Sequence, residues 1–180
     1  MRFPVTKNHS KGKHVSETSP NYPKGIPYIV SNEAAERFSY YGMRTILVIF
    51  LTKYMVNTAG NPDVLTPAQA KTWYHLFTTG VYFFPILGAL ISDMYWGKYR
   101  TIIRLSIVYC FGPFCFAMFE FKTGFALGLF LIAVGSGGIK PCVSAHVGDQ
   151  FTKENSSLID KAFALFYFSI NLGAFVSTLA

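Results

Sequence analysis

The chain has 180 residues, of which 51% are hydrophobic and 17% aromatic, and it carries a formal net charge of +7. This hydrophobic share is close to that of ordinary soluble domains, so bulk composition alone does not identify a membrane protein. The three cysteines lack the spacing of metal ligands, which argues against a metal site.

The order of the residues is more informative than the totals. Residues 1–27 are polar and basic, contain four prolines and lack an apolar signal-peptide core, so we expect a disordered cytoplasmic tail. Five apolar segments follow, each near the length of about 20 residues that crosses a bilayer. They lie near residues 28–55, 68–92, 101–119, 123–147 and 160–180.

Two arguments support a membrane protein with a cytoplasmic N-terminus. A soluble helical bundle would need polar faces along its outer helices, and residues 76–91 and 125–139 have none. With the N-terminus inside, ten lysines and arginines fall in cytoplasmic segments and three at outer ends. The sequence therefore predicts an all-α, polytopic membrane protein, and its basic character gives no reason to expect a nucleic-acid partner.

The first apolar segment contains four charges within twelve residues, on Glu33, Glu36, Arg37 and Arg44. At about 100° per residue they share one helix face with Tyr40 and Tyr41, while the opposite face is apolar. A charged side chain at the bilayer centre costs about 2.5–3.5 kcal/mol even on insertion scales. We therefore expect this face to line a hydrated cavity enclosed by protein.

The turn between the second and third segments carries Asp93, Gly97, Lys98 and Arg100. A tight turn there would place Asp93 beside cations, where an ion pair could hold the inner side closed in one state and break in another. An ordinary solvated loop is the alternative. Tyr82 in the second segment and Asn171 in the fifth need polar partners, and taken singly each favours helix packing over ligand binding.

The fourth segment places Lys140 at membrane depth, after three glycines that permit close helix packing. The alternative is that Lys140 snorkels to the inner surface. Together with the first segment it gives three cations against two carboxylates, which suits a substrate carboxylate. Because a cation stabilises the charged form of a nearby carboxylate, drawing that cation to a bound anion would favour proton uptake.

Three ordered motifs resemble those of the proton-dependent oligopeptide transporters, a branch of the major facilitator superfamily. Residues 33–42 match the E-x-x-E-R-F-x-Y-Y-G signature, residues 135–151 look like the fourth-helix signature, and residues 170–174 are similar to the fifth-helix signature. The resemblance covers about residues 22–180. It implies a fold of twelve or more spans, of which this chain would supply about five, as an incomplete N-terminal six-helix bundle (residues 28–180).

The resemblance also implies a function and a set of roles. The transporter would sit in the plasma (inner) membrane and move di- and tripeptides inward by alternating access, with protons as coupling ions and no cofactor, metal or enzymatic activity. Proton coupling would fall to Glu33, Glu36, Arg37 and Lys140; peptide binding to Arg44, Lys140, Tyr40, Tyr41, Tyr82 and Asn171; and gating to Asp93, Gly97, Lys98 and Arg100.

Two departures from the family pattern qualify these expectations. Ala89 stands where the superfamily turn motif usually has glycine, and Met94 where it has a basic residue, which weakens the gating role of Asp93. The chain also stops inside its fifth span, so we expect a fragment that lacks its C-terminal bundle and does not transport alone.

Other functions remain open from the sequence. A relative of the same fold could move nitrate or an organic acid. A membrane enzyme or a non-transporting bundle is disfavoured because the sequence has no metal-ligand spacing and no nucleophile elbow.

Overall fold

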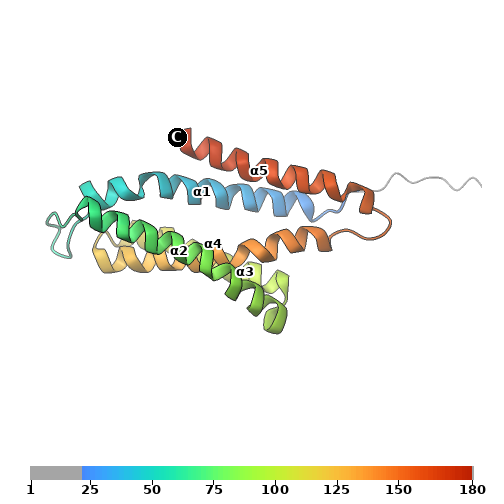
Figure 1. Cartoon of the computed structure of the whole chain (residues 1–180), viewed down its shortest axis with the longest axis horizontal. Helices are drawn as coiled ribbons and strands as arrows, with labels where there is room; N and C mark the ends of the chain where they lie inside the picture. Colours follow the sequence, from blue (N-terminus) through green and yellow to red (C-terminus); the bar gives the residue numbers. More distant parts are fainter. Residues whose placement is uncertain (1–21, 180) are drawn as a thin grey trace, which may run out of the picture.

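The computed structural model describes residues 22–179, which form five long helices and two short helical turns (Figure 1). The helices are α1 (Ile26–Lys53), α2 (Pro67–Ile91), α3 (Lys98–Met118), α4 (Lys122–Asp149) and α5 (Ile159–Leu179), with a π-helical turn η1 (Ser92–Trp96) and a 3-10 turn η2 (Ser156–Leu158). Each long helix overlaps one of the five predicted segments.

The predicted tail, residues 1–27, falls mostly outside the described residues, which begin at residue 22. At its end the expectation was wrong, because α1 already begins at Ile26. Pro27 stands in the first turn of that helix, where its fixed backbone angle suits a helix and its missing N–H leaves no bond unmade.

Four helical stretches are long and apolar enough to cross a membrane, judged by length and composition: α2 with η1, α3, α4, and η2 with α5. Helix α1 has 28 residues, which is long enough, but its five charged residues lower its hydropathy. Figure 1 shows successive long helices running in opposite directions, as consecutive crossings would. The crossing by α1 stays a prediction.

Helix α4 is the centre of the packing. It packs mainly against α2 and α3, while α1 packs along α5 (Figure 1). In the most apolar window of α4, 61% of the residues are buried, against 22–28% in the other three stretches. A helix that is apolar all round is expected in such a central position.

Helices α2 and α4 cross with their backbones in contact. A Cβ atom at Gly88 of α2 would collide with the carbonyl oxygen of Gly138 in α4. The thiol of Cys142 donates a weak hydrogen bond to the Gly88 carbonyl, with 3.8 Å between sulfur and oxygen. Glycine at position 88 therefore permits the close approach of the two helices, as small residues do in membrane bundles.

The connection from α1 to α2, residues 54–66, is anchored at the end of the molecule away from the N-terminus. Met55 and Leu65 are buried, and Lys122 at the start of α4 lies 2.6 Å from Asp63. Thr66 and Gln69 form a capping box that begins α2. The predicted outer ends of α1, α2 and α4 are thereby tied together.

Candidate functional site

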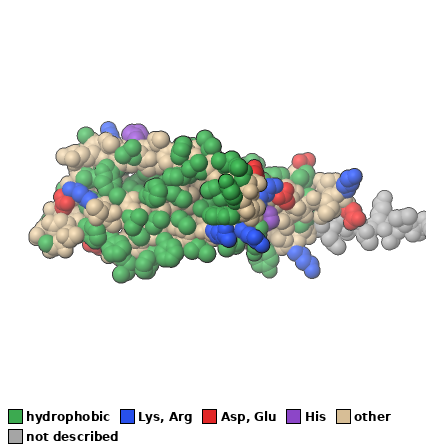
Figure 2. Space-filling view, turned by 90° about the horizontal axis from the view of Figure 1, so that it is seen from below, with side chains coloured by type: hydrophobic (Ala, Val, Ile, Leu, Met, Phe, Trp, Pro, Cys, Tyr) green, Lys and Arg blue, Asp and Glu red, His purple; other side chains and the backbone are tan. Residues whose placement is uncertain are grey.

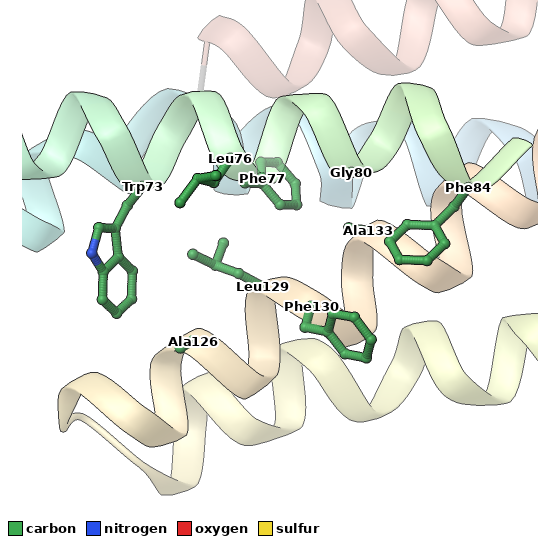
Figure 3. Close-up of a pocket in the computed structure, with 9 residues that line it drawn as sticks. All are labelled: Trp73, Leu76, Phe77, Gly80, Phe84, Ala126, Leu129, Phe130 and Ala133. Atoms are coloured by element: carbon green, nitrogen blue, oxygen red, sulfur yellow. The ribbon is translucent and has the colours of Figure 1, made fainter.

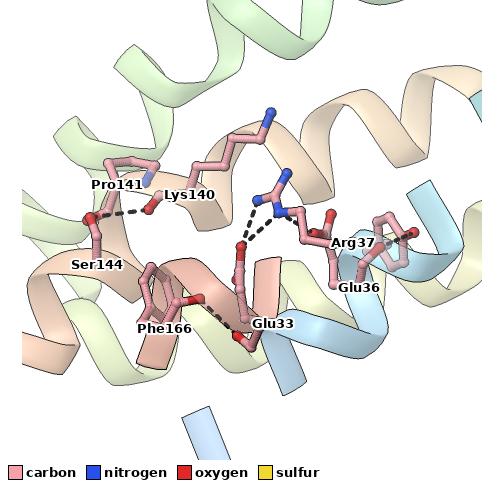
Figure 4. Close-up of polar contacts among 9 residues, drawn as sticks. Glu33, Glu36, Arg37, Lys140, Pro141, Ser144 and Phe166 are labelled. Atoms are coloured by element: carbon pink, nitrogen blue, oxygen red, sulfur yellow. Dashed lines mark hydrogen bonds and ion pairs between the residues drawn. The ribbon is translucent and has the colours of Figure 1, made fainter. Parts of the chain in front are cut away.

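Arg37 of α1 contacts two carboxylates of its own helix (Figure 4). Its Nη2 lies 2.7 Å from Glu33 Oε1, and its Nε donates a 2.7 Å hydrogen bond to the same oxygen. Glu36 Oε2 lies 3.1 Å from the same Nε. The Glu33–Arg37 pair follows from the sequence spacing, because residues four apart are neighbours on a helix surface. All three side chains are at most 9% exposed, so the charges are buried together.

Protein groups leave parts of both carboxylates unsatisfied. Glu33 Oε2 and both Glu36 oxygens accept no hydrogen bond from residues 22–179. Buried polar atoms in proteins are usually hydrogen-bonded, and a buried charge without partners is costly. These oxygens are therefore placed to take up a proton or to accept a hydrogen bond from a bound molecule.

Lys140 extends from α4 toward this cluster, and Figure 4 shows its side chain directed toward Arg37. Its Nζ lies 5.4 Å from the centre of the Tyr40 ring and 5.8 Å from that of Tyr82. In the described part of the chain, no carboxylate lies within 4.0 Å of this nitrogen. Lys140 thus points toward α1 and α2 instead of snorkelling, and its charge is free to meet an anion.

Arg44 lies further along the same face of α1 and is held by α2. Its Nε donates a 2.6 Å hydrogen bond to the hydroxyl of Tyr74, and its guanidinium carbon lies 5.5 Å from the centre of that ring. The side chain is half-buried. An arginine positioned in this way keeps further N–H donors for a carboxylate.

The predicted peptide-binding tyrosines lie near these cations. Tyr40 is buried, and its ring stands edge-on to the half-buried Tyr41, with 5.3 Å between the centroids. Tyr82 is 73% exposed and faces Lys140. The structure therefore gathers Tyr40, Tyr41 and Tyr82 around the charges of α1 and α4.

Asn171 is not brought to this cluster. Its amide nitrogen donates a 2.8 Å hydrogen bond to the Tyr167 carbonyl of its own helix, and its side chain is exposed. It lies two positions from the buried Ser169 and two from the buried Gly173, which puts it about half a turn from the face of α5 that packs on α1. Its contact with a peptide backbone stays a prediction.

The predicted gating turn has a different ion pair from the one expected. Lys98 Nζ lies 2.7 Å from Asp149 at the end of α4. Asp93 is exposed and, within residues 22–179, has no lysine or arginine within 4.0 Å. Gly97 ends the turn with a φ of 74°, a left-handed conformation that favours glycine. Arg100 is exposed. A gating role for these residues stays a prediction.

An apolar cavity of about 400 Å³ lies between α2 and α4 (Figure 3). Aromatic and aliphatic side chains line it, including Trp73, Phe84 and Leu129. None of the predicted site residues lines this cavity, although Phe77 in its wall lies 6.0 Å from the Tyr40 ring. No charged side chain is among its lining residues, and it is distinct from the cluster on α1 and α4.

Sequence reasoning missed three polar neighbours of the charged cluster. Tyr74 binds Arg44, the Tyr109 hydroxyl lies 3.4 Å from the Glu36 carbonyl, and the fully buried Ser136 lies next to Glu36. The contact between Tyr74 and Arg44 could have been predicted from the similar depths of the two residues in the membrane. Tyr74 is seven residues from the outer end of α2 and Arg44 nine from that of α1, which is about 11 and 14 Å at 1.5 Å per residue.

Across the described residues, no three histidine, cysteine, aspartate or glutamate side chains come together in a way that could hold a metal ion.

Comparison with known proteins gives consistent similarities. The model of the POT family (PTR2) matches residues 99–180. "Peptide transporter family 1" of Drosophila melanogaster is 47% identical over 165 residues, covering 87% of this chain and 21% of that protein. Human "Solute carrier family 15 member 2" is 42% identical over 167 residues, covering 88% and 22%. The crystal structure of the POT family transporter PepTSo superposes with a TM-score of 0.80 at 50% identity, covering 88% of this chain and 31% of that one. The chain thus spans about a fifth of the length of the curated relatives.

Proposed function

Because this chain belongs to the POT family and is part of a multi-pass membrane protein, we propose that it forms part of a proton-coupled symporter for di- and tripeptides. The transporter moves its substrate into the cytoplasm by alternating access between this helical bundle and a C-terminal bundle of the same protein. It lies in the plasma (inner) membrane with its N-terminus in the cytoplasm, protons are its coupling ions, and it is not an enzyme.

One observation carries this proposal. Two buried carboxylates, each with an oxygen that accepts no hydrogen bond from the described residues, share Arg37. Lys140, which has no carboxylate within 4.0 Å in that part of the chain, reaches toward them from another helix. A peptide carboxylate attracted to Lys140 and Arg44 changes the charge balance around Glu33 and Glu36. Binding of the anion and protonation of a carboxylate are then linked, and this linkage is reciprocal.

The roles are those that the resemblance implies, and the gathering of the charges and tyrosines of α1, α2 and α4 supports them. Glu33, Glu36, Arg37 and Lys140 couple protons to transport. Arg44, held by Tyr74, binds the peptide carboxylate together with Lys140, while Tyr40, Tyr41 and Tyr82 line the peptide site. Asn171 contacts the peptide from a face of α5 that is exposed in this part of the protein.

Transport of nitrate or an organic acid by the same fold is less well supported. The Drosophila melanogaster relative carries the name of a peptide transporter. The face around Lys140 is rich in tyrosine, which suits a substrate longer than a small anion. Counterflow into vesicles preloaded with dialanine or with nitrate separates the two cargoes.

The decisive experiment uses the full-length protein in proteoliposomes. We expect Glu36→Gln and Lys140→Ala to abolish dialanine uptake driven by a pH gradient, while expression stays at the wild-type level. Glu36→Gln should keep counterflow, because exchange needs no net proton movement and glutamine resembles the protonated acid. Lys71→Ala, which removes an exposed lysine near the start of α2, is the matched control. Concentrative uptake at the wild-type rate by either site variant would overturn the proposal.

A further inference from the structure

Helix α3 has an outward face that ends in two arginines. Residues three or four apart line up along a helix, and this spacing joins Arg100 and Arg104 to a run of exposed apolar residues on one face. The apolar residues are Ile107, Phe111, Phe114 and Met118, each between 54% and 59% exposed. The other face of α3 packs on α4 through Thr101, Leu105, Tyr109, Gly112 and Cys115.

The length of this face matches a bilayer. Helix α3 has 21 residues, which is about 31 Å at 1.5 Å per residue, close to the thickness of a hydrocarbon core. The apolar run occupies the part toward Met118. Arg104 lies six residues, or about 9 Å, from the start of the helix, a depth from which arginine can snorkel to the headgroup region.

Within the described chain, Arg100 and Arg104 have no acidic partner, whereas the nearby Lys98 has one. Lys98 is neutralised by Asp149 at 2.7 Å, whereas neither Arg100 nor Arg104 has a carboxylate within 4.0 Å in the described chain. The guanidinium of Arg104 lies 4.4 Å from the centre of the Trp96 ring. Stacking of this kind orients the group and leaves its in-plane N–H donors free for a phosphate.

Aromatic side chains surround the arginines. Tyr95 and Tyr99 are 74% and 64% exposed, and Trp96 is 37% exposed. Figure 2 shows lysine and arginine side chains gathered at one end of a broad hydrophobic surface. Tryptophan, tyrosine and arginine together are typical of the membrane–water interface.

We propose that Arg100 and Arg104, with Trp96 orienting Arg104, bind the phosphate of an anionic phospholipid in the cytoplasmic leaflet. The net negative charge of such a lipid complements the two unpaired cations, while its acyl chains continue along the apolar face of α3. The inference depends on the predicted orientation in the membrane and not on which substrate the transporter carries.

The test uses the full-length protein in phosphatidylcholine nanodiscs that contain a trace of photoreactive phosphatidylglycerol. Labelled peptides are mapped and quantified by mass spectrometry. Wild-type protein should be labelled at the start of α3, and labelling should fall about fivefold for Arg104→Gln and again about fivefold when Arg100→Gln is added, as expected for loss of single charges near an anionic surface. Lys71→Gln, at the opposite end of the bundle, should leave it unchanged.

Two further measurements test whether the labelling is specific for an anionic lipid. A photoreactive phosphatidylcholine should label wild-type α3 much less than phosphatidylglycerol does, and this comparison does not depend on any variant folding. Excess inorganic phosphate should not displace the lipid. The proposal is overturned if α3 stays unlabelled because another part of the protein covers it, if both lipids label it equally, if the arginine variants label as wild type does, or if free phosphate competes.

Discussion

At the scale of single residues, the site depends on the balance of buried charge around Arg37. One guanidinium faces two carboxylates, and all three side chains are shielded from solvent by neighbouring helices. Removing one partner of a buried ion pair is strongly destabilising, because it leaves charge buried without compensation. Replacing all the partners by neutral groups removes that penalty.

This balance predicts a non-additive result. Arg37→Gln alone should lower the free energy of unfolding by about 3–5 kcal/mol, because Glu33 and Glu36 are left facing each other. The triple variant Glu33→Gln, Glu36→Gln, Arg37→Gln should recover most of this loss. Thermal unfolding of the purified full-length protein measures both. A triple variant less stable than Arg37→Gln would contradict the charge argument.

The Arg44–Tyr74 hydrogen bond gives a second prediction for single residues. Tyr74→Phe removes the hydroxyl that holds Arg44, and a hydrogen bond to a charged group contributes about 1.5–3 kcal/mol. We expect the KM for dialanine to rise roughly tenfold or more, with a smaller change in maximal rate. Tyr28→Phe, which removes an exposed hydroxyl at the start of α1, should change neither. An unchanged KM in Tyr74→Phe would show that Arg44 needs no support from α2.

At the scale of helices, the contact between α2 and α4 depends on Gly88, which lies against the backbone of Gly138. Gly88→Ala should cost about 1–3 kcal/mol by overpacking, although alanine is otherwise the better helix former. Gly148→Ala is the matched control, because a Cβ there meets no atom within 4 Å, and it should be neutral or stabilising. Gly88→Ala should therefore unfold at a lower temperature than the wild type, and Gly148→Ala should not. Equal stability of Gly88→Ala and Gly148→Ala would mean that α2 and α4 can move apart without a loss of stability.

Much of the helical arrangement could be predicted from the sequence. The five long helices overlap the predicted segments because long apolar runs have few structural alternatives in a membrane. The approach of Lys140 to α1 could also be predicted from the depths of the residues in the membrane. Lys140 is nine residues from the predicted inner end of α4, and Glu36 is ten residues from that of α1.

The contact partners of individual polar and charged side chains could not be predicted in the same way. Lys98 is close in sequence to Asp93 but binds Asp149, 51 residues away, because the π-helical turn and Gly97 set the direction in which α3 leaves α2. Tyr74, Tyr109 and Ser136 were missed for a related reason. A single tyrosine or serine in an apolar helix has no periodic signal, and only the rotation of the helix decides which group it contacts.

At the scale of the whole molecule, the alternation of helices defines two sides. Residues 54–66 and 119–121 lie at one end, and residues 92–97 and 150–158 at the other, with the start of α1 (Figure 1). The predicted orientation puts the second end in the cytoplasm.

Cysteine labelling in intact cells checks this orientation. In the full-length protein with Cys110, Cys115 and Cys142 replaced by alanine and with any further cysteine removed, Thr58→Cys should react with a membrane-impermeant maleimide. Ser156→Cys, also at an exposed position, should react only after the cells are permeabilised. The reverse pattern would place the N-terminus outside and remove the basis for a cytoplasmic lipid at Arg100 and Arg104.

The burial of Arg37 has a consequence for how the protein is made. Gly173 of α5 lies against α1 beside Ala34 and Arg37, yet it is translated 136 residues after Arg37. At about 5–20 residues per second, the ribosome takes roughly 7–27 seconds to supply that partner. During this interval α1 exposes a charged stripe that lipid does not accept, so the translocon or a chaperone must shelter it. Helix α1 therefore reaches its final packing only after α5 has been made.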